Sequence, residues 1–196
     1  MKQNLHYFLR RYNQIEGDLL DIIDYIEPKV DWDDSCYQVG SSKLMDFALK
    51  VGTEIETLFR TIILSNKFDG EQGIEKNRDN QNINVYSDVL NGFYNFHEYE
   101  LTISFLDTQI SPFLEFSQDN IPDWFSIYSK EKHNKIKLIE AWNLKHSLHA
   151  LGGLLVLVVN HPSVEGMTFK THSISNKVFQ EPPLPRFAKS ITSVSF

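Results

Sequence analysis

A short basic segment, residues 130–137, carries the side chains of this chain that are best suited to chemistry. It holds one acidic residue, Glu131, among four lysines and a histidine: Lys130, Lys132, His133, Lys135 and Lys137. The segment has a formal charge of +3, whereas the whole chain carries −7. A local excess of positive charge in an acidic protein predicts a surface that binds anions, and phosphate groups in particular.

These residue types could act on RNA. The imidazole of His133 could accept the proton of a ribose 2′-hydroxyl as a general base. The ammonium group of Lys132 could stabilise the negative charge that develops on phosphorus. A base and a cation in these positions would support RNA cleavage without a metal ion. The predicted site therefore has two candidate catalytic residues, His133 and Lys132, and three candidate phosphate-binding residues, Lys130, Lys135 and Tyr128.

Helical spacing would bring these side chains together. If residues 128–137 form one helix, Lys130, His133 and Lys137 lie along one side, because residues three or four apart share a face. Tyr128, Lys132 and Lys135 then line the adjacent side of the helix. The alternative is a lysine-rich helix face that only contacts water, which is the usual role of a charge run.

No other pattern in the chain predicts a catalytic or metal site. His146 and His149 are spaced for one helix face, but no His-Glu-x-x-His or Cys-x-x-Cys motif accompanies them, which favours structural histidines. The acidic loop from Asp31 to Asp34 lacks the glycine and the final glutamate of a calcium-binding loop. The single cysteine, Cys36, lies in no motif that marks a nucleophile. We therefore expect neither a metal nor a cofactor.

The spacing of apolar residues predicts a mainly helical protein that positions this site. Helical stripes run over residues 4–26 and 44–63, and over 141–159, where apolar residues fill almost every side of a central helix. Ser41 or Ser42 is expected to cap the second of these helices. Further predicted elements are a helix over 84–98, a short strand over 101–105, and a helix from about 123 that carries the basic segment.

Composition indicates a folded, soluble protein. With 41% hydrophobic and 13% aromatic residues, the 196-residue chain can bury one sizeable core. We expect one domain over 1–162 and an extended or flexible tail over 163–196. The longest apolar run, 148–159, is shorter than the roughly 20 residues of a membrane span. No membrane partner is expected, and the single cysteine and the lack of a signal-peptide pattern favour the cytoplasm.

Two regions of the chain resemble the HEPN superfamily of helical nucleotide-binding or RNase domains. The first runs from Phe47 to Phe59 and places Glu54 among apolar residues, as in the HEPN helix that carries a glutamate. The second is the spacing Trp124-x-x-x-Tyr128-x-x-x-Lys132-His133 ahead of the final apolar helix, which is similar to an uncharacterised bacterial branch of the superfamily.

The resemblance implies a fold, a partner and an activity. The implied fold is a four-helix up-and-down bundle, commonly a homodimer in which the polar motifs of two subunits meet. Together with the short β-segments and the C-terminal tail that the sequence pattern predicts, the expected protein is mainly α. The implied role is binding of RNA or a nucleotide, with Glu54 as a supporting residue. Metal-independent ribonuclease activity of a defence or toxin–antitoxin kind would follow, with a cognate antitoxin-like protein as partner.

The chain departs from the motif of active HEPN ribonucleases, which carry an arginine four to six residues before the histidine. Here the nearest arginine before His133 is Arg78. Lysine cannot reproduce the planar two-point contact of arginine with a phosphate, so Lys130 or Lys132 would act only as a point charge.

The sequence leaves two hypotheses open. One is an RNA- or nucleotide-binding HEPN-like protein, with or without ribonuclease activity. The other is a non-catalytic helical interaction module in which an aromatic loop packs on the bundle or on a second subunit. The loop contains four large rings, those of Phe113, Phe116, Trp124 and Phe125.

Overall fold

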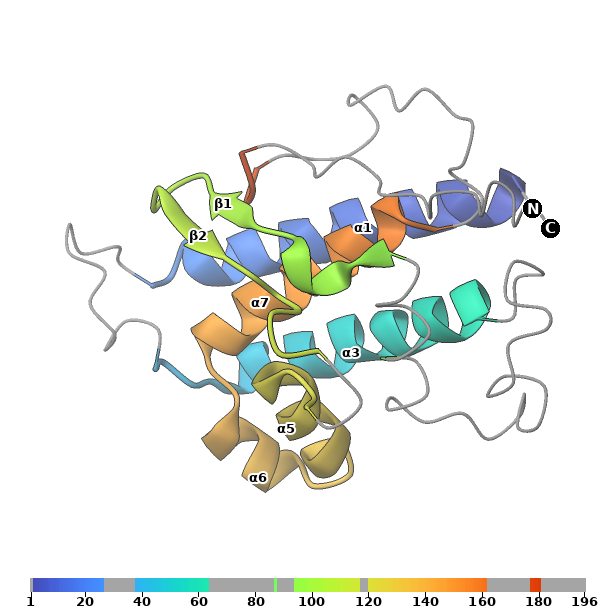
Figure 1. The fold of residues 1–196 in the computed structure, drawn as a ribbon. Coiled ribbons are helices and arrows are strands. Elements are labelled where there is room, and N and C mark those ends of the chain that lie inside the picture. The colour runs from blue at the N-terminus through green and yellow to red at the C-terminus, as the bar shows by residue number, and fades with distance from the viewer. Residues whose placement is uncertain are drawn as a thin grey trace, which may run out of the picture.

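The computed structural model describes residues 2–26, 38–63, 87, 94–116, 120–161 and 177–180, and every structural statement below concerns these residues. This part of the chain is mainly helical, as predicted, and carries one small antiparallel sheet (Figure 1). The α-helices are α1 (Lys2–Ile23), α3 (Ser42–Ile63), α5 (Asp123–Glu131), α6 (Lys135–Ala141) and α7 (Leu144–Val159). The shorter elements are η2 (Phe96–Glu98), β1 (Leu101–Ile103) and β2 (Thr108–Ile110).

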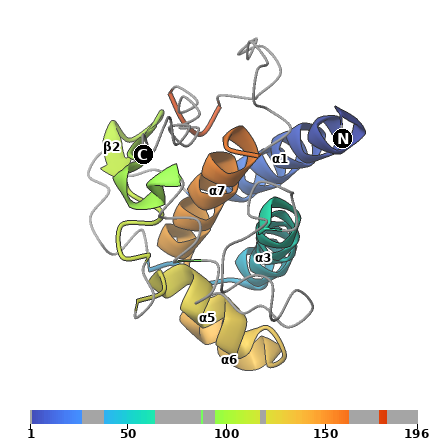
Figure 2. The same ribbon diagram turned by 45° about the vertical axis from the view of Figure 1, so that its right-hand side comes forward.

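Three long helices, α1, α3 and α7, pack pairwise against one another and hold the core (Figures 1 and 2). α3 buries one side because its apolar residues recur every three or four positions, from Leu44 through Ile55 to Ile62. Its first turn is capped by Ser41, whose Oγ accepts the Leu44 amide at 3.2 Å. From Ala150 to Val159 every residue of α7 is buried, which confirms the prediction of a central helix.

The predicted helix over 141–159 is two helices in the structure. α6 ends at Ala141 and α7 begins at Leu144, because the extended backbone of Trp142 and Asn143 separates them. Asn143 caps α7 by accepting the His146 amide on its side chain at 3.0 Å. The Trp142 indole donates to Ser147 Oγ at 2.8 Å and fixes the junction in the core. The expectation of uninterrupted helix from Ala141 is therefore wrong.

The strand predicted over 101–105 is present as β1, and a second strand, β2, pairs with it. The pairing is antiparallel and places Leu101 opposite Ile110. The predicted tail contributes residues 177–180, which lie along the other edge of β1: Ser104 N–H donates to the Val178 carbonyl at 2.8 Å. Val178 and Phe179 are both buried. This short segment of the tail thus packs on the domain.

Several predictions fall wholly or largely outside the described residues. They concern the acidic loop with Cys36, most of the helix over 84–98 and most of the tail. Of the predicted helix, Ser87 and Tyr94 are helical, and the positive φ of 50° at Asn95 separates Tyr94 from η2. Among the helices described, none combines the length and the apolar character that crossing a bilayer demands.

Candidate functional site

The basic segment forms a corner between two short helices. α5 ends at Glu131 and α6 starts at Lys135, so His133 lies in the turn between them. The turn is closed by Asn134, whose side chain accepts the Lys137 amide at 3.3 Å. The single helix expected over 128–137 is therefore wrong, and Lys130, His133 and Lys137 do not follow one helix face.

Most cations of this segment face solvent. We use the name basic corner for four exposed residues: Lys130, His133, Lys135 and Lys137. None of the four side chains forms an ion pair or hydrogen bond with a described residue. The ammonium groups of the three lysines are thus free to meet an anion from solution.

Lys132 and Tyr128 have a different environment, because both side chains pack against α3. Lys132 Nζ lies 2.6 Å from Glu56 Oε1, and the Tyr128 hydroxyl donates to Glu56 Oε2 at 3.3 Å. The ammonium group also lies 5.3 Å from the centre of the Tyr128 ring. Glu56 therefore offsets the charge of Lys132, and sequence reasoning had overlooked this carboxylate.

Tyr128 belongs to the core rather than to the surface. It is 2% exposed, and its ring lies on Gly52 of α3 so closely that a Cβ at that glycine would overlap it. Burial raises the pKa of Tyr128 to about 12; hydrogen bonding with Thr53 opposes the shift and the Glu56 carboxylate adds to it. The hydroxyl therefore stays protonated at neutral pH and is turned toward Glu56, not toward the basic corner.

Glu54, the predicted supporting residue, faces α1. Its Oε1 accepts from Arg11 Nε at 2.6 Å, and Arg11 also donates to Gln14 at 2.9 Å. The hydrogen bond with Glu54 raises the pKa of Arg11 further above its ordinary value. The structure thus brings together Tyr128 and Lys132, leaves His133 exposed beside them in sequence, and engages Glu54 with another helix.

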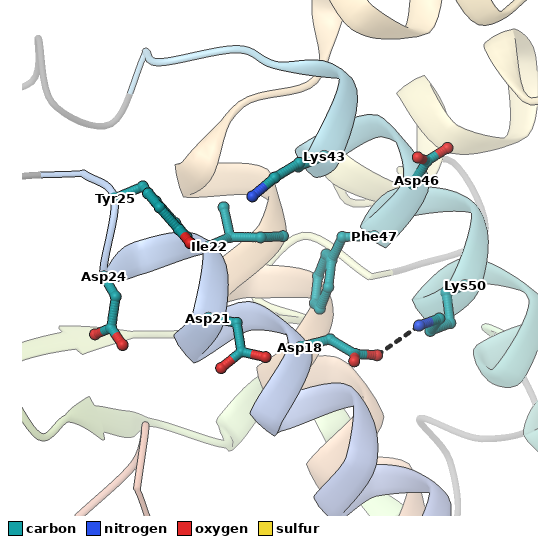
Figure 3. Close-up of a pocket in the computed structure, with 9 residues that line it drawn as sticks. All are labelled: Asp18, Asp21, Ile22, Asp24, Tyr25, Lys43, Asp46, Phe47 and Lys50. Atoms are coloured by element: carbon teal, nitrogen blue, oxygen red, sulfur yellow. Dashed lines mark hydrogen bonds and ion pairs between the residues drawn. The ribbon is translucent and has the colours of Figure 1, made fainter.

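Two of the hollows in the described part of the chain are well formed, and neither of these is lined by a predicted site residue. The acidic groove, about 580 Å³, lies between the end of α1 and the start of α3 (Figure 3). Four aspartates and two lysines supply its charges: Asp18, Asp21, Asp24, Asp46, Lys43 and Lys50. Lys50 pairs with Asp18 at 2.5 Å, and Lys43 lies 4.2 Å from the centre of the Tyr25 ring. The groove is a negatively charged surface that disfavours polyanions.

The second hollow, which we call the histidine pocket, has a volume of about 410 Å³. It lies where α5 and α7 begin, and residues far apart in sequence meet there. His146 and His149 of α7 line it together with Gln38, Ser111, Pro112, Leu114, Glu115, Pro122, Asp123, Trp124, Ala141, Asn143 and Lys145. Burial is the largest cause that lowers the pKa of both histidines, that of His149 to about 4, so both imidazoles are neutral at pH 7.

The described residues contain no group of three or more histidine, cysteine, aspartate or glutamate side chains arranged to hold a metal ion. Comparison with known proteins finds no match to the chain, whether by family model, by similarity to curated proteins or by similarity to solved structures. Function must therefore be inferred from the residues themselves.

Proposed function

We propose that this chain is a HEPN-like helical protein that binds RNA or a nucleotide phosphate through the basic corner. The observation that carries this proposal is the set of three unpaired, exposed lysines around the turn between α5 and α6, with His133 beside them, in a protein whose net charge is −7. Exposed lysines without carboxylate partners can approach phosphate oxygens at little cost, because no existing ion pair has to be broken.

The charge distribution also supports a single orientation for a polyanion. The acidic groove lies on α1 and α3, while the basic corner is at α5 and α6. The acidic groove repels a strand of RNA and the basic corner attracts it, so contact should be confined to a few phosphates. This predicts modest affinity with a strong dependence on salt.

The HEPN-like fold is part of the same proposal. In it α1, α3 and α7 are three members of a four-helix bundle, and the α5–α6 pair takes the place of the fourth. A homodimer would bring two basic corners onto one RNA, and an antitoxin-like protein could cover them by presenting acidic residues. Oligomeric state measured by light scattering, with and without RNA, tests the dimer.

Binding without cleavage is the form of this function that the geometry favours. In a ribonuclease, His133 would be the base and Lys132 the stabilising cation. The charge of Lys132 is already offset by Glu56 at 2.6 Å, and Glu54 is held by Arg11 at 2.6 Å. Cleavage would require Lys132 to leave Glu56 when substrate binds. We therefore place ribonuclease activity second to binding.

The binding experiment is fluorescence anisotropy with a labelled single-stranded RNA at several salt concentrations. Each phosphate contact to a single strand contributes about −0.7 to the slope of log K against log salt, so three contacts give about −2. Replacing Lys130 and Lys135 with serine should lower affinity and flatten this slope. Lys43→Ser, which removes a lysine of the acidic groove, is the matched control and should not weaken binding.

The cleavage experiment uses the same RNA in the presence of EDTA. If the protein is a ribonuclease, His133→Ala should abolish cleavage while helicity is unchanged and the three lysines of the basic corner still bind RNA. Equal cleavage by wild type and His133→Ala would exclude His133 as the base.

A non-catalytic interaction module remains the second candidate, and one observation favours it. The aromatic loop packs inward: Phe59 of α3 lies 5.8 Å from Phe116 and 6.0 Å from Phe125, measured between ring centres. Leu114 and Ile136 are left 67% and 72% exposed, as isolated apolar contacts for a partner. If RNA and mononucleotides show no salt-sensitive binding, this candidate replaces the first.

A further inference from the structure

The histidine pocket is a preorganised site that the proposed function does not use. Its volume of about 410 Å³ lies within the roughly 300–1,000 Å³ of small-molecule pockets. The wall is fixed by hydrogen bonds: the Trp124 indole donates to the Pro112 carbonyl at 2.8 Å, and Asn143 donates to Gln38 at 3.0 Å. These groups are already satisfied, so they shape the pocket and leave other side chains to meet a ligand.

A glycine lets the indole form this wall. A Cβ at Gly153 of α7 would lie 3.0 Å from Trp124 Cζ2, which is tighter than ordinary contact. Trp124 can therefore lie against α7 just beside the pocket, and together with Pro122 and the exposed Leu114 it gives the hollow an apolar side.

The polar groups that remain favour a positive ligand. Two carboxylates, Glu115 and Asp123, line the pocket against one ammonium group, that of Lys145. The side chain of His149 makes no hydrogen bond to a described residue and lines the same hollow. A neutral imidazole has one nitrogen that accepts a hydrogen bond, so it can receive an N–H group of a ligand without repelling its charge.

We propose that the histidine pocket binds a small organic cation with a flat apolar body, in chemical terms an amidinium or a protonated aromatic amine. The body lies on the side formed by Leu114, Pro122 and Trp124, and the cationic N–H groups face the Asp123 carboxylate. An anion would meet two carboxylates there, and the basic corner plays no part. The site therefore stands whether or not the protein binds RNA.

Three probes of nearly the same shape and different charge test this assignment: benzamidine, benzamide and benzoate. Each is titrated into the ¹⁵N-labelled full-length protein, and backbone amide shifts are followed by NMR. Benzamidine should give saturable shifts centred on Leu114, Trp124 and His149. Benzamide should bind more weakly, and benzoate should give no saturable shifts.

Two isosteric variants separate charge from shape. Asp123→Asn should weaken benzamidine binding about three- to fivefold, the value of an exposed ion pair, while benzamide binding stays within twofold. Asp46→Asn makes the same change of charge in the acidic groove and should alter neither the affinity for benzamidine nor the affinity for benzamide. The amide spectrum of each variant reports whether it is folded.

Other results would overturn the proposal. Shifts centred outside the pocket, or an absence of saturable shifts with benzamidine at millimolar concentration, would remove the site. Benzamide or benzoate binding as tightly as benzamidine would remove the assignment to a cation. If Asp123→Asn loses affinity for benzamide and for benzamidine equally, Asp123 shapes the pocket and does not select the charge of the ligand.

Discussion

Glu54 and Glu56 lie two residues apart on α3 and bind cations on opposite sides of that helix. Glu54 pairs with Arg11 of α1 at 2.6 Å, and Glu56 pairs with Lys132 at the end of α5, also at 2.6 Å. Residues two apart point in nearly opposite directions on a helix, so one turn of α3 ties together the helices on either side of it. Lys132 is consequently held back from the basic corner by the Glu56 carboxylate, and its ammonium group also lies over the Tyr128 ring.

Glu56→Gln should release Lys132 and tighten RNA binding. With the carboxylate gone, the ammonium group can contact one more phosphate, and we expect the dissociation constant to fall about two- to fivefold, with a steeper salt slope. The loss of stability should be below about 1 kcal/mol, because both partners are partly exposed. Anisotropy titration and urea denaturation measure the two effects.

The control for this change is Glu54→Gln, which acts on the opposite side of α3. It should leave RNA affinity unchanged and lower stability by about 1–3 kcal/mol, because Glu54 is buried and its partner Arg11 loses a charge-assisted hydrogen bond. Unchanged affinity in Glu56→Gln, while removal of Lys130 and Lys135 weakens binding, would show that Lys132 is no part of the RNA-binding surface.

Gly52→Ala should destabilise the protein even though alanine favours helix. A Cβ at Gly52 would overlap the ring of Tyr128, so α5 must move away from α3 or the ring must leave its position. Overpacking of this kind costs about 1–3 kcal/mol, more than the roughly 1 kcal/mol that alanine gains over glycine in a helix. Chemical denaturation measures the difference.

Gly17→Ala is the matched control for that substitution. Gly17 is in the interior of α1, and nothing lies within 4 Å of the position that a Cβ would occupy. Alanine there should raise stability by about 0.4–1 kcal/mol. If Gly52→Ala is as stable as wild type, the close contact between α3 and α5 is not rigid, and Tyr128 is free to move.

The long helices could be predicted from sequence because each buries one face, and burial of one face leaves a 3.6-residue repeat. Leu44, Ile55 and Ile62 carry that repeat openly. The breaks between α5 and α6 and between α6 and α7 leave a weaker signal in the sequence. Asn134 and Asn143 are good N-cap residues, but each is followed by residues that continue the helical spacing, so periodicity outweighed the caps.

The partners of the polar residues could not be predicted from periodicity. The resemblance to HEPN helices, and not the helical spacing, names Glu54 as a candidate site residue, whereas Glu56 lies on the polar side of α3. Which of them meets Lys132 depends on how α5 docks, and docking is set by the contact between Gly52 and the Tyr128 ring. Gly52 and Tyr128 are 76 positions apart, so their contact leaves no local pattern in the sequence.

Glu16→Met should release residues 177–180 from the domain. Glu16 is fully buried, and its Oε1 accepts the Val178 amide at 3.0 Å. Methionine keeps the volume but removes the acceptor, and an unpaired buried amide costs about 1–3 kcal/mol. Hydrogen exchange should therefore become faster at Val178 and at Gln180, whose amide donates to the Thr102 carbonyl at 3.0 Å.

The control for this experiment lies within the same molecule. The amide of Asn160 donates to the Val156 carbonyl at the end of α7 and does not depend on Glu16. Its exchange should be unchanged in Glu16→Met. If hydrogen exchange becomes faster by the same factor at Asn160 and Val178, the substitution destabilises the whole domain, and Glu16 does not specifically stabilise residues 177–180.

Stability should fall as the pH drops from about 6.5 to about 4, and buried histidines account for it, chiefly His149 and His161, with His146 acting in the same direction. Burial lowers the pKa of His149 from 6.5 to about 4, and Lys145 and His146 add to that shift. Burial also lowers the pKa of His161 to about 4. Between these values the unfolded chain binds protons that the folded chain does not. The contribution is therefore complete above pH 6.5 and is lost progressively below it.

The slope of the free energy of unfolding against pH is the measurement. Each histidine contributes at most about 1.4 kcal/mol per pH unit in this window, and His149 contributes less than that because its ring keeps some contact with water. Urea denaturation at pH 7, 6 and 5 should show a shallower slope for His149→Gln than for wild type. Identical slopes for wild type and His149→Gln would mean that this imidazole titrates alike in the folded and the unfolded chain, and hence that the histidine pocket does not hold it neutral.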